Sequence, residues 1–238
     1  MSADYPLSTL QIACLRDDAV TVHRMLASGA LFDSRSVHGS RPLHAASRSG
    51  TAAMQMLVAR GANVRATDDN GLTAIHTAAF ANNSEGVQML LAKGADMSAR
   101  SAHLDSTALH DACKSGSKSA AMTLLQHGAN CLSIGHSGMS PIHYNTVHGH
   151  VALSVLLVQH CADVLAVDAD GQTAEGIAVR NGFRETTALL QRFFSAQATQ
   201  ATLARREAFS TGNGPRLGEM SVVFLLEPGV VDAILVLV

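Results

Sequence analysis

The sequence predicts an all-α fold in which short helical hairpins stack side by side into a solenoid. Three regular features lead to this prediction: a recurring histidine, a pair of apolar residues behind it, and a small glycine-containing motif behind the pair. The histidines are His44, His76, His110 and His143, at intervals of 32, 34 and 33 residues. A period of about 20 to 50 residues is typical of repeat architectures in which each unit packs only on its neighbours.

The first helix of each unit is expected to begin just before its histidine. Thr73, Thr107 and Ser140 stand three residues ahead of theirs and can cap the first backbone N–H groups. Pro42 and Pro141 occupy the first helical position, where a missing N–H costs nothing. Small residues shortly after the histidine allow the helix to pack closely on its neighbours. These residues are Ala45–Ala46, Ala78–Ala79 and Ala112–Cys113.

The second helix of each unit is expected to follow a turn near Gly50, Gly116 or Gly149 and to end at another glycine. That terminal glycine suits the left-handed backbone of a helix C-cap. Each second helix carries one apolar pair: Leu57–Val58, Leu90–Leu91, Leu124–Leu125 and Leu156–Leu157. Helices of about 8 to 10 residues are marginal alone, because nucleation is costly. Burial of a leucine contributes about 1.5 to 3 kcal/mol, so adjacent units must cover one another.

Divergent units extend the repeat in both directions, with Gln11 at the histidine position upstream and Gly176 downstream. Six repeats and a C-terminal tail result. The expected repeats span residues 5–36, 37–68, 69–101, 102–134, 135–167 and 168–194, and the tail spans 195–238. The tail holds a glycine-rich linker and an apolar segment that Pro228 and Gly229 interrupt. This segment is a weak candidate for a membrane span, so membrane association is disfavoured but stays open, and a small β-hairpin is the other interpretation.

These motifs together resemble the ankyrin repeat family. The resemblance rests on Arg41–Ala46 and its counterparts, on the apolar pair, and on the closing Gly-Ala-Asn or Gly-Ala-Asp. It implies a structural hydrogen-bonding role for the motif histidines. The departures from the family pattern are Arg41 for the capping Thr, Gln11 and Gly176 for His, Cys161 for Gly, Glu175 for an apolar residue, and a second repeat one residue short between its helices. A charge at Glu175 favours a sixth repeat that caps the end of the array.

Composition and charge argue against several classes of partner. The 17 Lys and Arg nearly balance the 19 Asp and Glu, and a net charge of −2 lacks the basic excess typical of nucleic acid binding. The four cysteines are scattered and form no paired motif, which indicates a reducing compartment. The N-terminus does not read as a secretory signal. We therefore expect a cytoplasmic protein, with the nucleus as the other compartment.

The sequence motifs do not point to catalysis, a cofactor or a metal. The sequence holds no nucleotide-binding loop, nucleophile elbow or zinc-protease motif, so we expect no enzyme activity and no cofactor. The densest group of metal-ligand side chains is His148, His150, His160 and Cys161. Because His150 and His160 stand at opposite ends of an expected helix, about 15 Å apart at about 1.5 Å per residue, they are too far apart to share one zinc ion.

The ankyrin resemblance implies that partners engage the loop tips and the concave first-helix face. The positions that match are Arg48, Asp69, Asn70, Leu72, Phe80, His103, Leu104, Lys114, His136, Met139, Val147, His148 and Arg180. The repeat core does not need Leu72, Phe80, Leu104 or Met139, and basic residues flank them. A protein partner with apolar anchors and acidic residues would fit this patch. The other interpretation is a solvated face with incidental apolar residues.

Two hypotheses about function follow from these features. The first is a non-catalytic interaction module or adaptor, a monomer that binds a protein partner on its concave face. The second is the cytosolic regulatory region of a larger membrane protein or enzyme, such as a channel, an acyltransferase or a kinase. The family's arrays are often fused to such domains, and the apolar end of the tail motivates this alternative. The sequence does not identify the partner.

Overall fold

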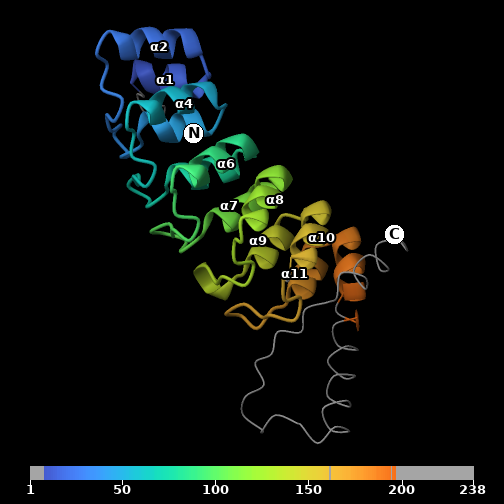
Figure 1. The fold of residues 1–238 in the computed structure, drawn as a ribbon. Helices are drawn as coiled ribbons and strands as arrows, with labels where there is room; N and C mark the ends of the chain where they lie inside the picture. The colour runs from blue at the N-terminus through green and yellow to red at the C-terminus, as the bar shows by residue number, and fades with distance from the viewer. Residues whose placement is uncertain (1–7, 161, 194, 197–238) are drawn as a thin grey trace, which may run out of the picture. The chain divides into compact units, whose positions relative to one another are not determined.

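The computed structural model describes residues 8–160, 162–193 and 195–196 (Figure 1). Within this part of the chain every regular element is a helix, and the extended pairing consists of two isolated β-bridges, Thr67 with Thr73 and Val167 with Thr173. The all-α prediction is therefore confirmed. The expectations for Cys161 and for the tail after residue 196 lie outside the described residues.

The chain divides into two compact units, one ending at His136 and the other beginning at Ser137. The helices of the first unit are α1 (Thr9–Leu15), α2 (Ala19–Ala27), α3 (Pro42–Ser47), α4 (Ala52–Ala59), α5 (Ala74–Phe80), α6 (Ser84–Ala92), α7 (Ala108–Ser115) and α8 (Lys118–Gln126). A short 3-10 turn, η1 (His136–Gly138), lies at the division. The second unit contains α9 (Pro141–Val147), α10 (Val151–Gln159), α11 (Ala174–Asn181) and a further helix over residues 184–193.

Within the first unit, helices of successive repeats pack on their counterparts. The first helices form one row, in which α1 packs on α3, α3 on α5, and α5 on α7. The second helices pack likewise, α2 on α4 and α6 on α8. Ala46, Ala78 and Ala112 are fully buried in the first row, where their small size allows close approach. Leu57 and Leu90 are fully buried from the second helices, so neighbouring repeats cover one another's apolar residues as expected.

The helix boundaries follow the local chemistry of the sequence. Pro42 and Pro141 are the first residues of their helices, as predicted. Gly61 and Gly94 follow their second helices with φ of 88° and 80°, in the left-handed region that glycine adopts without strain. One expectation is wrong: the second repeat does not lose its residue between the helices. Instead α4 has 8 residues where α6 and α8 have 9, so the second helix itself is shorter.

His44, His76 and His143 each bind backbone groups through both ring nitrogens. In the third repeat, the backbone N–H of Thr73 donates to Nδ1 of His76 at 3.2 Å. Because Nδ1 accepts, the proton sits on Nε2, which donates to the carbonyl oxygen of Ser106 in the next repeat at 3.2 Å. His44 and His143 make the same two kinds of hydrogen bond. Burial lowers the pKa of His44, His76 and His143, because a charged imidazole would be desolvated.

Gln11 performs the histidine's task in the first repeat. Its side-chain oxygen accepts from the backbone N–H of Ser8 at 2.9 Å, and its side-chain nitrogen donates to the carbonyl oxygen of Ser40 at 2.7 Å. An amide has the same acceptor and donor pair as a neutral imidazole. The departure from the repeat pattern at Gln11 therefore preserves the chemistry and confirms a structural role for this position.

The sixth repeat carries its charged residue at a partly open position. Glu175 is half-buried, and the side-chain nitrogen of Gln191 donates to its carboxylate at 3.0 Å. This exposure removes the cost that full burial of a carboxylate would impose. None of the described helices has the length and apolarity needed to cross a membrane.

Candidate functional site

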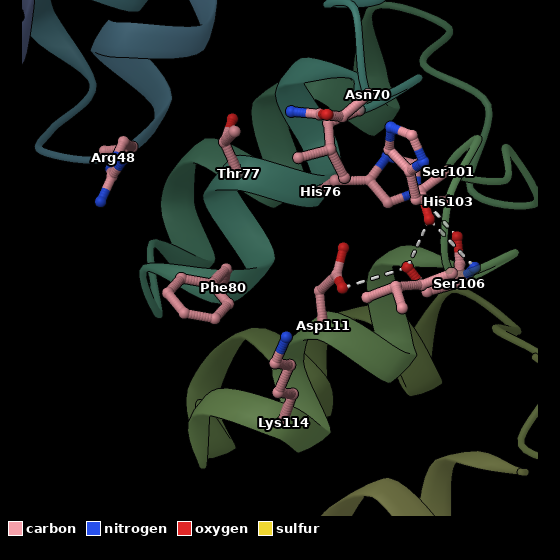
Figure 2. A pocket seen from close by; sticks show the side chains of 12 residues that line it. Arg48, Asn70, His76, Thr77, Phe80, Ser101, His103, Ser106, Asp111 and Lys114 are labelled. Atoms are coloured by element: carbon pink, nitrogen blue, oxygen red, sulfur yellow. Dashed lines mark hydrogen bonds between the residues drawn. The ribbon is translucent and has the colours of Figure 1, made fainter. Parts of the chain in front are cut away.

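A cavity of about 410 Å³ lies on the first-helix face of the first unit, bordered by α5, α7 and the loops that precede them (Figure 2). We call it the α5–α7 cavity. Seven of the thirteen residues expected to contact a partner line it: Arg48, Asn70, Leu72, Phe80, His103, Leu104 and Lys114. Three successive repeats thus bring together residues that are up to 66 positions apart in sequence, from Arg48 to Lys114.

The cavity floor contains residues that the sequence analysis did not select. Thr77, Ser101 and Asp111 line the cavity, together with Ser106 and the scaffold residue His76. Asp111 directly follows the motif histidine, where the other repeats have Ala45, Thr77 and Tyr144. A single charged residue at a position that is otherwise neutral was the sequence signal that could have identified it.

A short chain of hydrogen bonds orients Asp111. The Ser106 hydroxyl donates to Oδ1 of Asp111 at 3.2 Å, and the hydroxyls of Ser101 and Ser106 lie 2.8 Å apart. Since the Ser106 proton goes to the carboxylate, the Ser101 hydroxyl donates to Ser106. Asp111 is only 7% exposed, and burial raises its pKa to about 6, while the Ser106 hydrogen bond and the charge of Lys114 act in the opposite direction.

The mouth of the cavity is apolar and basic. The Phe80 ring is 46% exposed at the end of α5. Leu72 and Leu104 are half-buried in the two loops, and both belong to the cavity wall. Arg48 is exposed and Lys114 is half-buried (Figure 2). An exposed aromatic ring between two cationic side chains suits a contact that is partly apolar and partly electrostatic.

A second cavity of about 340 Å³ adjoins the first on the N-terminal side. It shares Arg48, Asn70, Leu72 and Thr77 with the α5–α7 cavity, so the two hollows open onto one face. Leu15, four residues after Gln11, also lines it. We refer to the two cavities together as the first-helix groove, which runs across the four repeats of the first unit.

The other six expected contact residues have different surroundings. Asp69 forms an ion pair with Arg35 at 2.8 Å and so joins neighbouring loop tips. His136 is exposed, and its backbone N–H donates to the carbonyl oxygen of Leu104 at 2.8 Å. The remaining four belong to the second unit, where Met139 and Val147 are half-buried and His148 and Arg180 are exposed. The lining of the α5–α7 cavity includes none of these six.

The histidines flanking α10 lie at its two ends, with His150 before its first residue and His160 after its last. The rings of His148 and His150 stack with centroids 6.0 Å apart. Within residues 8–160, 162–193 and 195–196, no group of three or more His, Cys, Asp or Glu side chains has an arrangement that could hold a metal ion.

The sequence matches a known family of repeat proteins. A family model described as ankyrin repeats in three copies matches residues 10–101 and again residues 109–200. The two matched segments together cover well over half of the chain. They include all residues that line the α5–α7 cavity except His103, Leu104 and Ser106, which lie between the segments. No curated protein matches the sequence.

Proposed function

The chain belongs to the ankyrin repeat family, whose repeats are generally protein-interaction modules, and we propose that it is a non-catalytic module or adaptor that binds a protein partner in the first-helix groove. The observation that carries this proposal is the exposed Phe80 ring beside a cavity of about 410 Å³. An aromatic side chain left 46% exposed at a hollow surface can bury further apolar area only against a partner.

The charges at the mouth indicate the chemistry of that partner. Arg48 and Lys114 flank Phe80, so acidic residues beside an apolar anchor would be attracted to both sides of the ring. The partner is therefore a protein segment that combines apolar and acidic residues. The protein acts as a monomer in the cytoplasm within this proposal.

Contacts in the second unit extend the same proposal. Val147 and Arg180 stand four residues after the histidine position of their repeats, as Phe80 and Lys114 do in theirs. His136, Met139 and His148 belong to the same set of loop and first-helix positions. We propose these residues, with Asp69 at its loop tip, as further contacts to a partner that reaches beyond the α5–α7 cavity.

The test compares the proteins that copurify with the full chain and with the double variant Phe80→Ala, Lys114→Glu. Partners identified by mass spectrometry should be lost from the double variant. A matched control is Val20→Ala, Lys93→Glu, which changes an exposed apolar residue of α2 and the exposed lysine that follows the last residue of α6. An unchanged partner set for the groove variant would contradict the proposal.

A further inference from the structure

The carboxylate of Asp111 is buried with only part of its hydrogen-bonding capacity used. Ser106 donates the one hydrogen bond that the described residues supply to it, at Oδ1. Figure 2 shows the second oxygen pointing away from Ser106, toward the α5 side of the cavity. A carboxylate that is only 7% exposed and carries a single hydrogen bond is costly, because most of its water has been removed without replacement.

None of the described residues donates a hydrogen bond to that second oxygen. Both ring nitrogens of His76 are engaged, Nδ1 by the N–H of Thr73 and Nε2 by the carbonyl oxygen of Ser106. The Ser101 hydroxyl donates to Ser106, because Ser106 donates to Asp111. Lys114 acts on Asp111 through its charge, but this effect is smaller than those of burial and of Ser106. The arrangement therefore orients an acceptor toward the cavity rather than toward the scaffold.

The cavity walls match an occupant with an apolar stem and a cationic head. Leu72 and Leu104 offer apolar surface to a methylene chain, and the Phe80 ring offers its face to a cation. Lysine and arginine side chains have this composition. A cation that reaches Asp111 would offset the loss of hydration that burial imposes on the carboxylate.

We propose that the α5–α7 cavity binds one lysine or arginine side chain of the partner, with the Asp111 carboxylate as its counter-ion. This inference rests on the proposed function. Arg48 and Lys114 at the mouth disfavour a segment that is basic throughout. The partner segment therefore carries a single basic residue among apolar and acidic ones. This adds a cationic anchor to the apolar and acidic contacts proposed above.

The test uses two small probes that differ in charge but little in shape. Nα-acetyl-arginine amide carries the cation, and Nα-acetyl-citrulline amide replaces the guanidinium with a neutral urea. Each is titrated into the ¹⁵N-labelled full chain, and the amide shifts of Ser106 and Asp111 are followed. We expect saturable shifts with arginine amide, with affinity on the order of millimolar, and binding at least about tenfold weaker with citrulline amide.

The variant Asp111→Asn keeps the side-chain shape and removes the charge. It should lower the affinity for arginine amide to that for citrulline amide. Glu85→Gln is the matched control, because it removes one exposed carboxylate on α6 that does not line the cavity, and it should leave the affinity unchanged. Equal binding of the two probes, or full affinity in Asp111→Asn, would overturn the inference.

A third probe, Nα-acetyl-glutamate amide, distinguishes binding of a cation at the cavity floor from binding of an anion at the basic mouth. Shifts of Ser106 and Asp111 with this acidic probe but not with arginine amide would also overturn the inference, while leaving the proposed function supported if Phe80→Ala, Lys114→Glu loses its partners. The converse result, arginine amide bound at Asp111 with an unchanged partner set, would support the cation site and contradict the proposed function.

Discussion

The starts of the first helices and the floor of the α5–α7 cavity both hold buried polar side chains, but they differ in how many polar atoms have partners. His76 is 1% exposed, and both of its ring nitrogens are hydrogen-bonded to backbone groups. Asp111 is 7% exposed, and one oxygen has a partner while the other points into the cavity. Full satisfaction is typical of a scaffold group, whereas a buried acceptor without a full set of partners is suited to binding.

Removing a scaffold histidine should have the largest effect. His76→Ala leaves the Thr73 N–H unpaired in a buried environment and creates a cavity between two repeats. We expect the free energy of unfolding to fall by about 3 kcal/mol, measured by urea unfolding followed with circular dichroism. The control is His103→Ala, an exposed histidine for which a change within about 0.5 kcal/mol is expected. A loss below about 1 kcal/mol for His76→Ala would contradict the scaffold role assigned to this histidine.

Neutralising Asp111 should increase the free energy of unfolding, whereas removing His76 lowers it. The folded pKa of about 6 lies above the ordinary value of 3.8, so ionisation at neutral pH destabilises the fold. This penalty is absent below pH 3.8, grows as the pH rises, and is complete above about pH 6. At about 1.36 kcal/mol for each pKa unit, Asp111→Asn should stabilise the protein by about 2 kcal/mol at pH 7.5, after allowance for the hydrogen bonds that the amide itself needs.

The measurement is the difference in urea midpoint between wild type and Asp111→Asn from pH 8 to pH 5. The difference should shrink as the pH falls through 6, because the wild-type carboxyl becomes protonated. Destabilisation by histidine protonation, which increases as the pH falls below 6.5, affects both proteins and cancels. Loss of stability in Asp111→Asn at pH 7.5 would show that Asp111 is a scaffold residue like His76.

Gln11 tests whether the scaffold position requires a histidine or only its hydrogen-bonding pattern. Gln11→Ala removes the acceptor for the Ser8 N–H and the donor to the Ser40 carbonyl, and should cost about 1.5 kcal/mol by urea unfolding. Gln11→His restores the same acceptor and donor and should remain within about 0.5 kcal/mol of wild type. A large loss in Gln11→His would mean that the amide fits this repeat in a way an imidazole cannot.

Truncation of the mouth residue should have the smallest effect on stability. Phe80→Ala removes a ring that is already 46% exposed, so the free energy of unfolding should change by less than about 1 kcal/mol. Its effect should appear in partner binding instead. If Phe80→Ala destabilises the protein as much as His76→Ala does, the ring belongs to the core and the mouth of the cavity is misassigned.

Much of the fold could be predicted from the sequence because its signals are local. The proline at the first helical position and the glycine after the second helix act through the backbone of their own segment. The position of the missing residue in the second repeat was predicted wrongly. The sequence shows that the segment from His44 to Gly61 is one residue short, but not whether the loop or the helix is shortened. The structure shows that α4 absorbs it.

The site was predicted less completely, for a different reason. Phe80 and Lys114 on the first helices and Leu104 in a loop were identified because the ankyrin resemblance implies partner contacts at those repeat positions. Ser101 and Asp111 were missed because their importance depends on burial and on each other. Asp69 was expected at the same surface as the cavity residues, but its ion pair with Arg35 holds it between loop tips.

The sequence by itself determined the repeat register, the helix ends and the all-α class, since capping, proline and glycine preferences operate over a few residues and several units share them. Only the tertiary structure decided which side chains enclose a cavity and how much water reaches each one. That distinction has a physical basis, because the pKa of Asp111 depends on its desolvation in the folded chain, which no local pattern encodes.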